Sequence, residues 1–246
     1  MNTDTRYLQS LWDRLPDSGV LAIPPGTYLT DGTLEWAGKG SPVVLAHGVT
    51  IKITLEPRPA IRLSKCSFAR ITGLRLEAPY NSDKPRPQGL TGLELVNVNY
   101  AKLDIDFIHY FHTGIKLVGD SKSCSYNEIS FGQIYAERGL VMEAKAGGWA
   151  NDIVLRRGKM TGPYPGTTFI ESLNGLPNPL RGLYSFGVTF ESREACLYRG
   201  SVATEVEFHG CYYEHPGAGK MTVEHAKKFR PVFFGGDPST LTFIEK

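Results

Sequence analysis

Short apolar triplets recur at a fixed spacing through the middle of the chain. Ile105, Ile129 and Ile153 lie 24 residues apart, and each begins an apolar-x-apolar triplet. A second set of triplets, each led by glycine, follows at a similar spacing: Gly92–Leu95, Gly114–Leu117 and Gly139–Met142. Repeats of about 20 to 50 residues are typical of solenoids, because one repeat cannot bury its apolar face without neighbours.

The repeat consists of very short strands, because apolar and other residues alternate and Gly, Asn and Ser interrupt the runs. No segment between the triplets has room for a helix. The pattern therefore predicts an all-β fold, a single right-handed parallel β-helix. We expect the three isoleucines to point inward and to stack in one column, meaning equivalent positions on successive turns. The third residues of the triplets should form a second inward column: Phe107, Phe131 and Leu155.

Two polar segments interrupt the spacing and are predicted to be loop insertions. Residues 79–88 separate Ile71 from Ile105, and residues 171–181 separate Ile153 from Val188. Removing each segment restores the spacing of 24 residues. Loops on a rigid scaffold commonly carry binding residues.

The first 18 residues depart from the strand pattern. An amphipathic helical stripe is formed by Tyr7, Leu8, Leu11, Trp12 and Leu15. Asp4 or Thr3 is expected to be the N-cap, and Pro16 with Gly19 should end the helix. A solenoid exposes apolar surface and strand edges at its ends. We therefore expect residues 1–18 to form a cap helix and residues 19–246 to form the parallel β-helix.

Composition and charge exclude several classes of protein. The formal net charge is only +2, so no basic footprint for nucleic acid is present. No apolar stretch reaches the roughly 18 residues that a membrane span needs. Met1 is not followed by a secretory leader. The four cysteines lack metal spacing, and we expect free, buried thiols rather than disulfides.

Motifs for cofactors or metals are also missing. His109 and His112 should lie on opposite faces of a strand, which argues against a metal site. No phosphate loop and no Gly-x-Ser-x-Gly elbow is present. We therefore expect no cofactor.

Several segments resemble known proteins. The opening Thr3–Gln9, followed by Val20–Tyr28, is similar to the start of right-handed β-helices of the pectate-lyase superfamily. Gly147–Asp152 with Arg157–Gly158 resembles a segment of phage tail spikes, and Cys211–Glu214 resembles a turn near the end of such solenoids. The resemblance covers residue 3 to about residue 215. The Asp-Asp, Gly-His-Gly and Arg-Ile-Lys motifs of polygalacturonases are absent, so pectin hydrolysis is not expected.

The resemblance implies a polysaccharide-binding β-helix, most like a tail-spike or receptor-binding module that recognises a bacterial surface glycan and can depolymerise it. Tail spikes are generally homotrimers, and such a protein belongs to a virion or acts outside the cell. A stand-alone polysaccharide lyase, glycoside hydrolase or epimerase is one alternative. A structural or assembly scaffold without a ligand is another. The sequence does not decide whether any bond is cleaved.

Aligning the triplets turns sequence positions into surface columns, because stacked strands lie about 4.8 Å apart. The alignment places Arg156, Glu191 and His209 on three consecutive turns. There, Arg156 would hold a substrate carboxylate, and Glu191 or His209 would move a proton. The same alignment predicts an acidic column next to them: Asp104, Glu128 and Asp152. The alternative is that both columns are exposed ion ladders of little energetic value.

The remaining candidate residues complete the site. Glu214 follows two tyrosines and joins Asp152 as a further catalytic candidate. Glycan-binding candidates are a guanidinium and rings that can stack on sugar C–H faces: Arg157, Trp149, His109 and Tyr135.

Overall fold

The computed structural model describes residues 1–80, 85–145, 147–162, 167–174, 182–192, 195–200, 205–214, 221–224, 228–232 and 241–244. One helix, α1 (Thr3–Arg14), precedes the strands. The strands of the first half are β1 (Val20–Ala22), β2 (Gly26–Thr30), β3 (Leu34–Ala37), β4 (Val43–Ile53), β5 (Pro59–Ser64), β6 (Arg70–Glu77), β7 (Thr91–Val96) and β8 (Lys102–Gly119). Those that follow are β9 (Ser123–Ser125), β10 (Glu128–Ala144), β11 (Trp149–Asn151), β12 (Ile153–Arg156), β13 (Lys159–Thr161), β14 (Thr167–Asn174), β15 (Leu183–Phe186), β16 (Thr189–Glu191), β17 (Ala195–Gly200), β18 (Glu205–His209), β19 (Tyr212–Glu214), β20 (Met221–Glu224), β21 (Lys228–Val232) and β22 (Leu241–Ile244).

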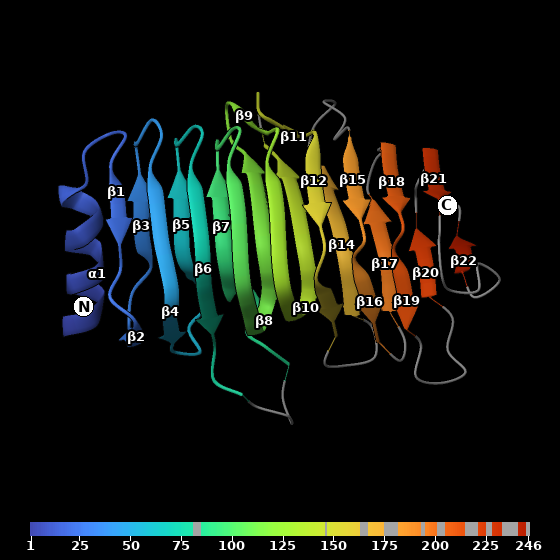
Figure 1. Ribbon diagram of the computed structural model, residues 1–246. Coiled ribbons are helices and arrows are strands. Elements are labelled where there is room, and N and C mark those ends of the chain that lie inside the picture. Colours follow the sequence, from blue (N-terminus) through green and yellow to red (C-terminus); the bar gives the residue numbers. More distant parts are fainter. Residues whose placement is uncertain are drawn as a thin grey trace.

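The strands wind into a parallel β-solenoid of about 7 turns among the described residues. Every strand pairing in the described ranges is parallel, and each strand pairs with strands of the neighbouring turns. Figure 1 shows the strands side by side along one axis, with α1 at one end and the C-terminal strands at the other. The predicted all-β parallel β-helix with an N-terminal cap helix is therefore confirmed.

Each turn contributes strands to three flat faces. Face one includes β12, β15 and β18; face two includes β13, β16 and β19; face three includes β14, β17 and β20. β8 and β10 are long enough to run through all three faces. Three bends per turn separate the faces, and the surface features below lie at these bends.

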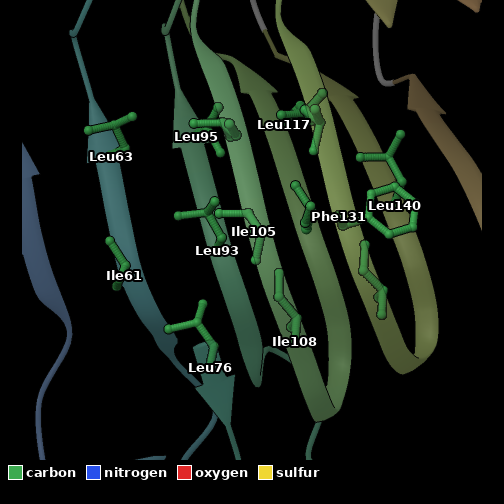
Figure 2. Close-up of a cluster of buried hydrophobic side chains, with 14 of the residues drawn as sticks. Ile61, Leu63, Leu76, Leu93, Leu95, Ile105, Ile108, Leu117, Phe131 and Leu140 are labelled. Carbon is green, nitrogen blue, oxygen red and sulfur yellow. The ribbon is translucent and has the colours of Figure 1, made fainter. Parts of the chain in front are cut away.

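Apolar side chains fill the interior in stacked columns. Leu93, Ile115 and Leu140 occupy one such column, with the pairings Leu93↔Ile115 and Leu140↔Ile115, and all three are fully buried. The glycine-led triplets thus stack as their spacing predicts. Figure 2 shows several of these aliphatic side chains projecting into the space between the strands.

The isoleucine column is shifted by two residues from the prediction. Ile129 pairs with Leu103 and with Leu155, whereas Ile105 pairs with Phe131. A shift of two residues keeps every side chain on the same side of a strand. For this reason Ile105, Ile129 and Ile153 are all buried, although they do not share one column.

Phe107 does not point inward as predicted. Its ring is only half-buried, while Ile105 and Ile108 are both fully buried. The strict alternation of inward and outward side chains is therefore interrupted where β8 bends from face one to face two. This interruption places an aromatic ring on the outside of the solenoid.

The cap helix packs its apolar stripe on the first turn. Trp12 stacks on Trp36 with ring centroids 5.3 Å apart. The N-cap is Asn2, whose Oδ1 accepts from the backbone N–H of Thr5 at 2.8 Å, so the prediction of Asp4 or Thr3 was wrong. Asp4 instead accepts from the backbone N–H of Leu29 at 2.8 Å and ties the helix to β2.

The predicted loops agree with the structure only in part. Residues 79–80 and 85–88 lie between β6 and β7, and residues 81–84 lie outside the described ranges. The second loop was predicted to begin at Glu171, but β14 continues to Asn174, and residues 175–181 lie outside the described ranges. The strand is longer than predicted because residues 171–174 continue the parallel pairing with residues 141–144 of β10.

An aromatic stack marks the bend between face three and face one. Phe68, Tyr100 and Tyr126 have left-handed φ angles of 54°, 56° and 58°, which are uncommon outside glycine. Their rings stack nearly parallel, with centroids 5.0 and 4.9 Å apart, and all three are largely exposed. All four cysteines are free and buried, as expected.

Candidate functional site

An open hollow of about 650 Å³ lies at the bend between face one and face two. Two aspartates of β8, Asp104 and Asp106, border it together with Arg75 of β6 and Arg157, which directly follows β12. Phe107 contributes an aromatic wall. The hollow thus combines carboxylates, guanidinium groups and an aromatic ring in one open volume.

Gly158 is required for the turns to approach each other at the hollow. Its φ of 105° is left-handed, and a Cβ atom there would lie 2.0 Å from the carbonyl oxygen of Phe131. Arg157, immediately before it, has a φ of 45°. The Arg-Gly pair therefore bends the chain sharply and leaves the arginine side chain on the outer surface.

Two ion pairs cross the hollow between turns. Nη2 of Arg157 lies 3.0 Å from each carboxylate oxygen of Asp104, and Nε of Arg75 donates to Asp106 at 2.8 Å. The Arg157 side chain is 70% exposed. Exposed pairs contribute little to stability. A guanidinium group has five N–H donors, so Arg157 has donors beyond Nη2 with which to bind a ligand.

An aromatic cluster continues from the hollow onto face two. The guanidinium of Arg75 lies 5.5 Å from the centroid of the Phe107 ring, and His109 stacks on the same ring at 4.5 Å. Tyr135 meets His109 edge-on at 6.3 Å and Tyr110 at 5.3 Å. The rings and their cation form a half-buried platform beside the open volume.

Burial lowers the pKa of His109. Desolvation is the main cause, and the smaller opposing effects come from a hydrogen bond with Gln133 and from the charge of Glu77. The buried Nε2 atom of His109 has no hydrogen-bond partner among the described residues.

Four of the predicted residues fall in one outward column of face two. The strand register aligns His109 with Tyr135, Tyr135 with Thr161, Thr161 with Glu191, and Glu191 with Glu214. The structure therefore brings together two glycan-binding candidates, His109 and Tyr135, and two catalytic candidates, Glu191 and Glu214.

Lys159 links the two carboxylates at the end of this column. Its Nζ forms a salt bridge with Glu191 and lies 3.9 Å from Glu214. The hydrogen bond to Glu191 is the main reason why the pKa of Lys159 is raised. Since successive turns are about 4.8 Å apart, the two glutamates are neighbours along the solenoid axis.

The predicted column of Arg156, Glu191 and His209 is wrong. Arg156 and His209 do share a column on face one, but Phe186 lies between them and Glu191 lies on face two. The guanidinium of Arg156 lies 5.2 Å from the Phe186 centroid, and the His209 ring stacks on Phe186 at 4.9 Å. The error comes from the assumed spacing between turns, because Ile153 pairs with Leu183 and not with Val188 as predicted.

Both ends of this ladder carry carboxylates. Arg156 donates to Glu128 at 2.8 Å, and Nε2 of His209 lies 2.9 Å from Glu207. Charge pairs and stacked rings therefore account for Arg156 and His209 as parts of a surface ladder, and neither residue lines the hollow.

The predicted acidic column does not form. Asp104 aligns with Ser130, whereas Glu128 aligns with Lys102 and with Val154. Asp152 lies at the bend that precedes β12, with a φ of 52°, and burial raises the pKa of its carboxyl group. The repulsion expected between three stacked carboxylates is therefore absent.

Trp149 lies apart from the hollow. Its side chain is 42% exposed on β11, which pairs with β9 in a separate small sheet. Figure 1 shows these two strands at one rim of the solenoid. Of the predicted glycan-binding residues, Arg157 borders the hollow, His109 and Tyr135 extend its aromatic wall, and Trp149 belongs to neither.

Sequence reasoning missed Arg75, Asp106 and Phe107 as site residues. Arg75 and Phe107 align in one outward column. An acid-x-acid-aromatic run at residues 104–107 was visible in the sequence. This run could not be recognised as part of a site from the sequence, because strict alternation assigns Phe107 to the core and the position of the bend was not known.

Among the described residues, no group of three His, Cys, Asp or Glu side chains is arranged to hold a metal ion. No helix in the described part of the chain is long and apolar enough to cross a membrane.

Comparison with known proteins gives no relative. No protein-family model matches this chain, and no curated protein is significantly similar to it in sequence. The assignment of function therefore depends on the geometry of the solenoid surface.

Proposed function

We propose that this protein binds a polysaccharide along face two, with the hollow at Arg75, Asp104, Asp106 and Arg157 as the anchoring subsite. The observation that carries the proposal is the hollow itself, in which two ion pairs stand beside the Phe107 ring in a volume of about 650 Å³. Volumes of about 300–1,000 Å³ are typical of ligand sites.

The chemistry of the hollow matches that of a sugar. Pyranose rings present an apolar C–H face, for which an aromatic ring such as Phe107 is a suitable platform. Their hydroxyl groups need fixed donors and acceptors, and the two arginine–aspartate pairs supply both kinds side by side. Charged partners make stronger hydrogen bonds than neutral ones.

The column on face two extends the site along the solenoid axis. After His109 and Tyr135, the next positions carry a threonine hydroxyl and then the two glutamates. Since the turns repeat about every 4.8 Å, polar groups and rings recur at a nearly constant spacing. This arrangement favours an extended chain of similar sugar units over a single small molecule.

A panel of capsular and exopolysaccharides, measured by calorimetry, tests the proposal. We expect one member of the panel to bind the natural protein saturably. Phe107→Ala should then weaken binding about 10-fold, because it removes the ring platform. Phe68→Ala is the control, since Phe68 is an outward-facing phenylalanine ring at a different bend.

Equal affinity of the two variants would remove the hollow as the binding site. Absence of binding across the panel would favour the alternative function, a structural or assembly scaffold without a ligand.

Glu191 and Glu214 favour a second function, cleavage of the bound chain. Two carboxylates on neighbouring turns approach the separation of about 5 to 5.5 Å used by retaining glycosidases, and Lys159 touches both. Glu191→Gln should abolish release of reducing ends while leaving binding intact. Unsaturated products, detected by their absorbance, would instead indicate a lyase. Retained turnover in Glu191→Gln would eliminate this pair.

A tail-spike or receptor-binding role on a virion is the biological context that we propose for glycan binding. Its support is the resemblance of the opening and of Gly147–Asp152 to such proteins. Sedimentation equilibrium tests the accompanying threefold assembly, because a stand-alone lyase, hydrolase or epimerase of this fold is expected to be a monomer.

A further inference from the structure

A second pocket lies at the bend between face two and face three, one bend further along the chain than the hollow. Its volume is about 280 Å³. β8 and β10 supply His112, Thr113, Lys116 and Arg138, and residues 88–91 close another side. The volume is slightly below the range of drug-sized ligands, so the pocket fits one sugar ring or a smaller group.

The lining of this basic pocket has two cations and no carboxylate. Lys116 and Arg138 line it, whereas their partners Glu143 and Glu171 do not. Nζ of Lys116 lies 2.7 Å from Glu143. An ammonium group has three N–H donors and a guanidinium group has five, so Lys116 keeps a donor beyond those facing Glu94 and Glu143, and Arg138 keeps donors beyond its pair with Glu171.

The hydroxyl groups of the pocket are buried. Thr91 and Thr113 are each only 4% exposed, and the Thr113 hydroxyl lies 3.2 Å from Nδ1 of His112. Buried hydroxyl groups beside cations are well placed to orient the polar atoms of a small ligand. The lining is therefore polar on several sides.

The pKa of His112 depends on its burial and on the nearby charge of Arg138. Burial is the main cause that lowers the pKa of His112, and the charge of Arg138 lowers it further. Arg138 therefore lies close enough to the imidazole to disfavour its protonated form, even though Arg138 is paired with Glu171.

We propose that the basic pocket binds the carboxylate of an acidic sugar. Lys116 and Arg138 provide charge-assisted hydrogen bonds, and Arg138 presents a planar fork that suits a two-oxygen anion. A single negative charge matches the pocket better than a doubly charged phosphate, because Glu94, Glu143 and Glu171 lie close behind the two cations.

The proposal that the ligand is a sugar rests on the proposed function. The proposal that the pocket binds a carboxylate depends only on the residues that line it. If both assignments hold, the glycan carries acidic units, and one of them occupies the basic pocket while neighbouring units lie on face two. The hollow and the basic pocket both include residues of β8 and β10, and on β8 Phe107 and His112 lie five positions apart.

Titration with glucuronate, followed by calorimetry and by the nuclear magnetic resonance signal of the His112 imidazole, tests the proposal. We expect glucuronate to shift the His112 signal saturably and glucose, its neutral counterpart, to leave it unchanged. Lys116→Gln and Arg138→Gln should each weaken glucuronate binding about 10-fold. Lys122→Gln is the charge-matched control, because Lys122 is exposed and does not line the pocket.

Three outcomes would overturn the proposal: equal shifts with glucose and glucuronate, equal affinities of Lys116→Gln and Lys122→Gln, or binding of inorganic phosphate without binding of glucuronate. Phe107→Ala separates this proposal from the previous one. Glucuronate binding that survives in Phe107→Ala supports the pocket even if no polysaccharide binds to the hollow.

Discussion

Two groups of ion pairs on the same solenoid have different surroundings. On face three, Arg62 lies between Glu35 at 2.9 Å and Glu94 at 2.7 Å, and Lys116 lies between Glu94 at 4.0 Å and Glu143 at 2.7 Å. In this charge ladder each inner charge has an opposite charge on both sides along the axis. The Glu94 side chain is only 13% exposed.

The hollow contains ion pairs of the same residue types, but its charges do not alternate along the axis. Asp104 and Asp106 each have one arginine partner, and the Arg157 side chain is 70% exposed. An aromatic ring and an open volume occupy the places where the ladder has further charges. The comparison teaches that ion pairs interleaved along the axis stabilise the coil and use more of each cation's donors, whereas pairs isolated at a bend keep more donors and acceptors accessible.

We expect the backbone beside the hollow to tolerate the substitution of a glycine less well than the backbone at another bend. Gly158→Ala should lower the free energy of unfolding by about 3 kcal/mol or more, because the added methyl group meets the Phe131 carbonyl oxygen and φ is left-handed. Gly187→Ala is the control: its φ is 62°, but nothing lies within 4 Å of the added atom. That variant should lose only about 1 kcal/mol. Urea denaturation measures both, and equal losses would show that packing at Gly158 has relaxed.

Exchanging one arginine in each group separates stability from binding. Arg62→Met should lower the free energy of unfolding by about 1 kcal/mol, the upper end for a partly exposed pair. Arg157→Met should change the free energy of unfolding by less than about 0.5 kcal/mol. It should, however, lower the affinity for the glycan that binds the natural protein about 10-fold. Denaturation and calorimetry on both variants check this. A stability loss in Arg157→Met as large as in Arg62→Met would contradict the distinction between the two groups.

The pH dependence of stability should depend on the histidine beside the hollow. Because burial lowers the folded-state pKa of His109 below its unfolded value of about 6.5, the unfolded chain binds more protons in that range. Stability is therefore fully present above about pH 6.5 and is lost as the pH falls toward the folded-state pKa. His112 acts in the same direction. His109→Gln should reduce the loss between about pH 7.5 and about pH 5, whereas Arg62→Met should not; an unchanged slope in His109→Gln would contradict the assignment.

The sequence predicted the architecture but not the register of every face. Gly92–Leu95 and Gly114–Leu117 stack as predicted, because these triplets lie within one straight segment of face three. Ile105 and Ile129 lie in turns of 26 residues, since Ile105 pairs with Phe131 and Ile129 with Leu155, and the spacing of 24 between the isoleucines did not reveal this.

The same limitation decided how well the site could be predicted. His109, Tyr135, Glu191 and Glu214 were recognised as candidates from residue type, yet their common column became visible only with the strand register. Phe107 was assigned to the core by alternation. Its outward position follows from the local bend, which depends on contacts between turns and not on the residues of one turn.

The aromatic stack gives the molecule an optical signal of its own. Tyr100 and Tyr126 lie face to face with centroids 4.9 Å apart and an angle of 6° between the rings. Rings held this closely couple their near-ultraviolet transitions, and the coupling disappears when the turns separate. The part of the near-ultraviolet circular dichroism that comes from this stack therefore reports the stacking of the turns without a label.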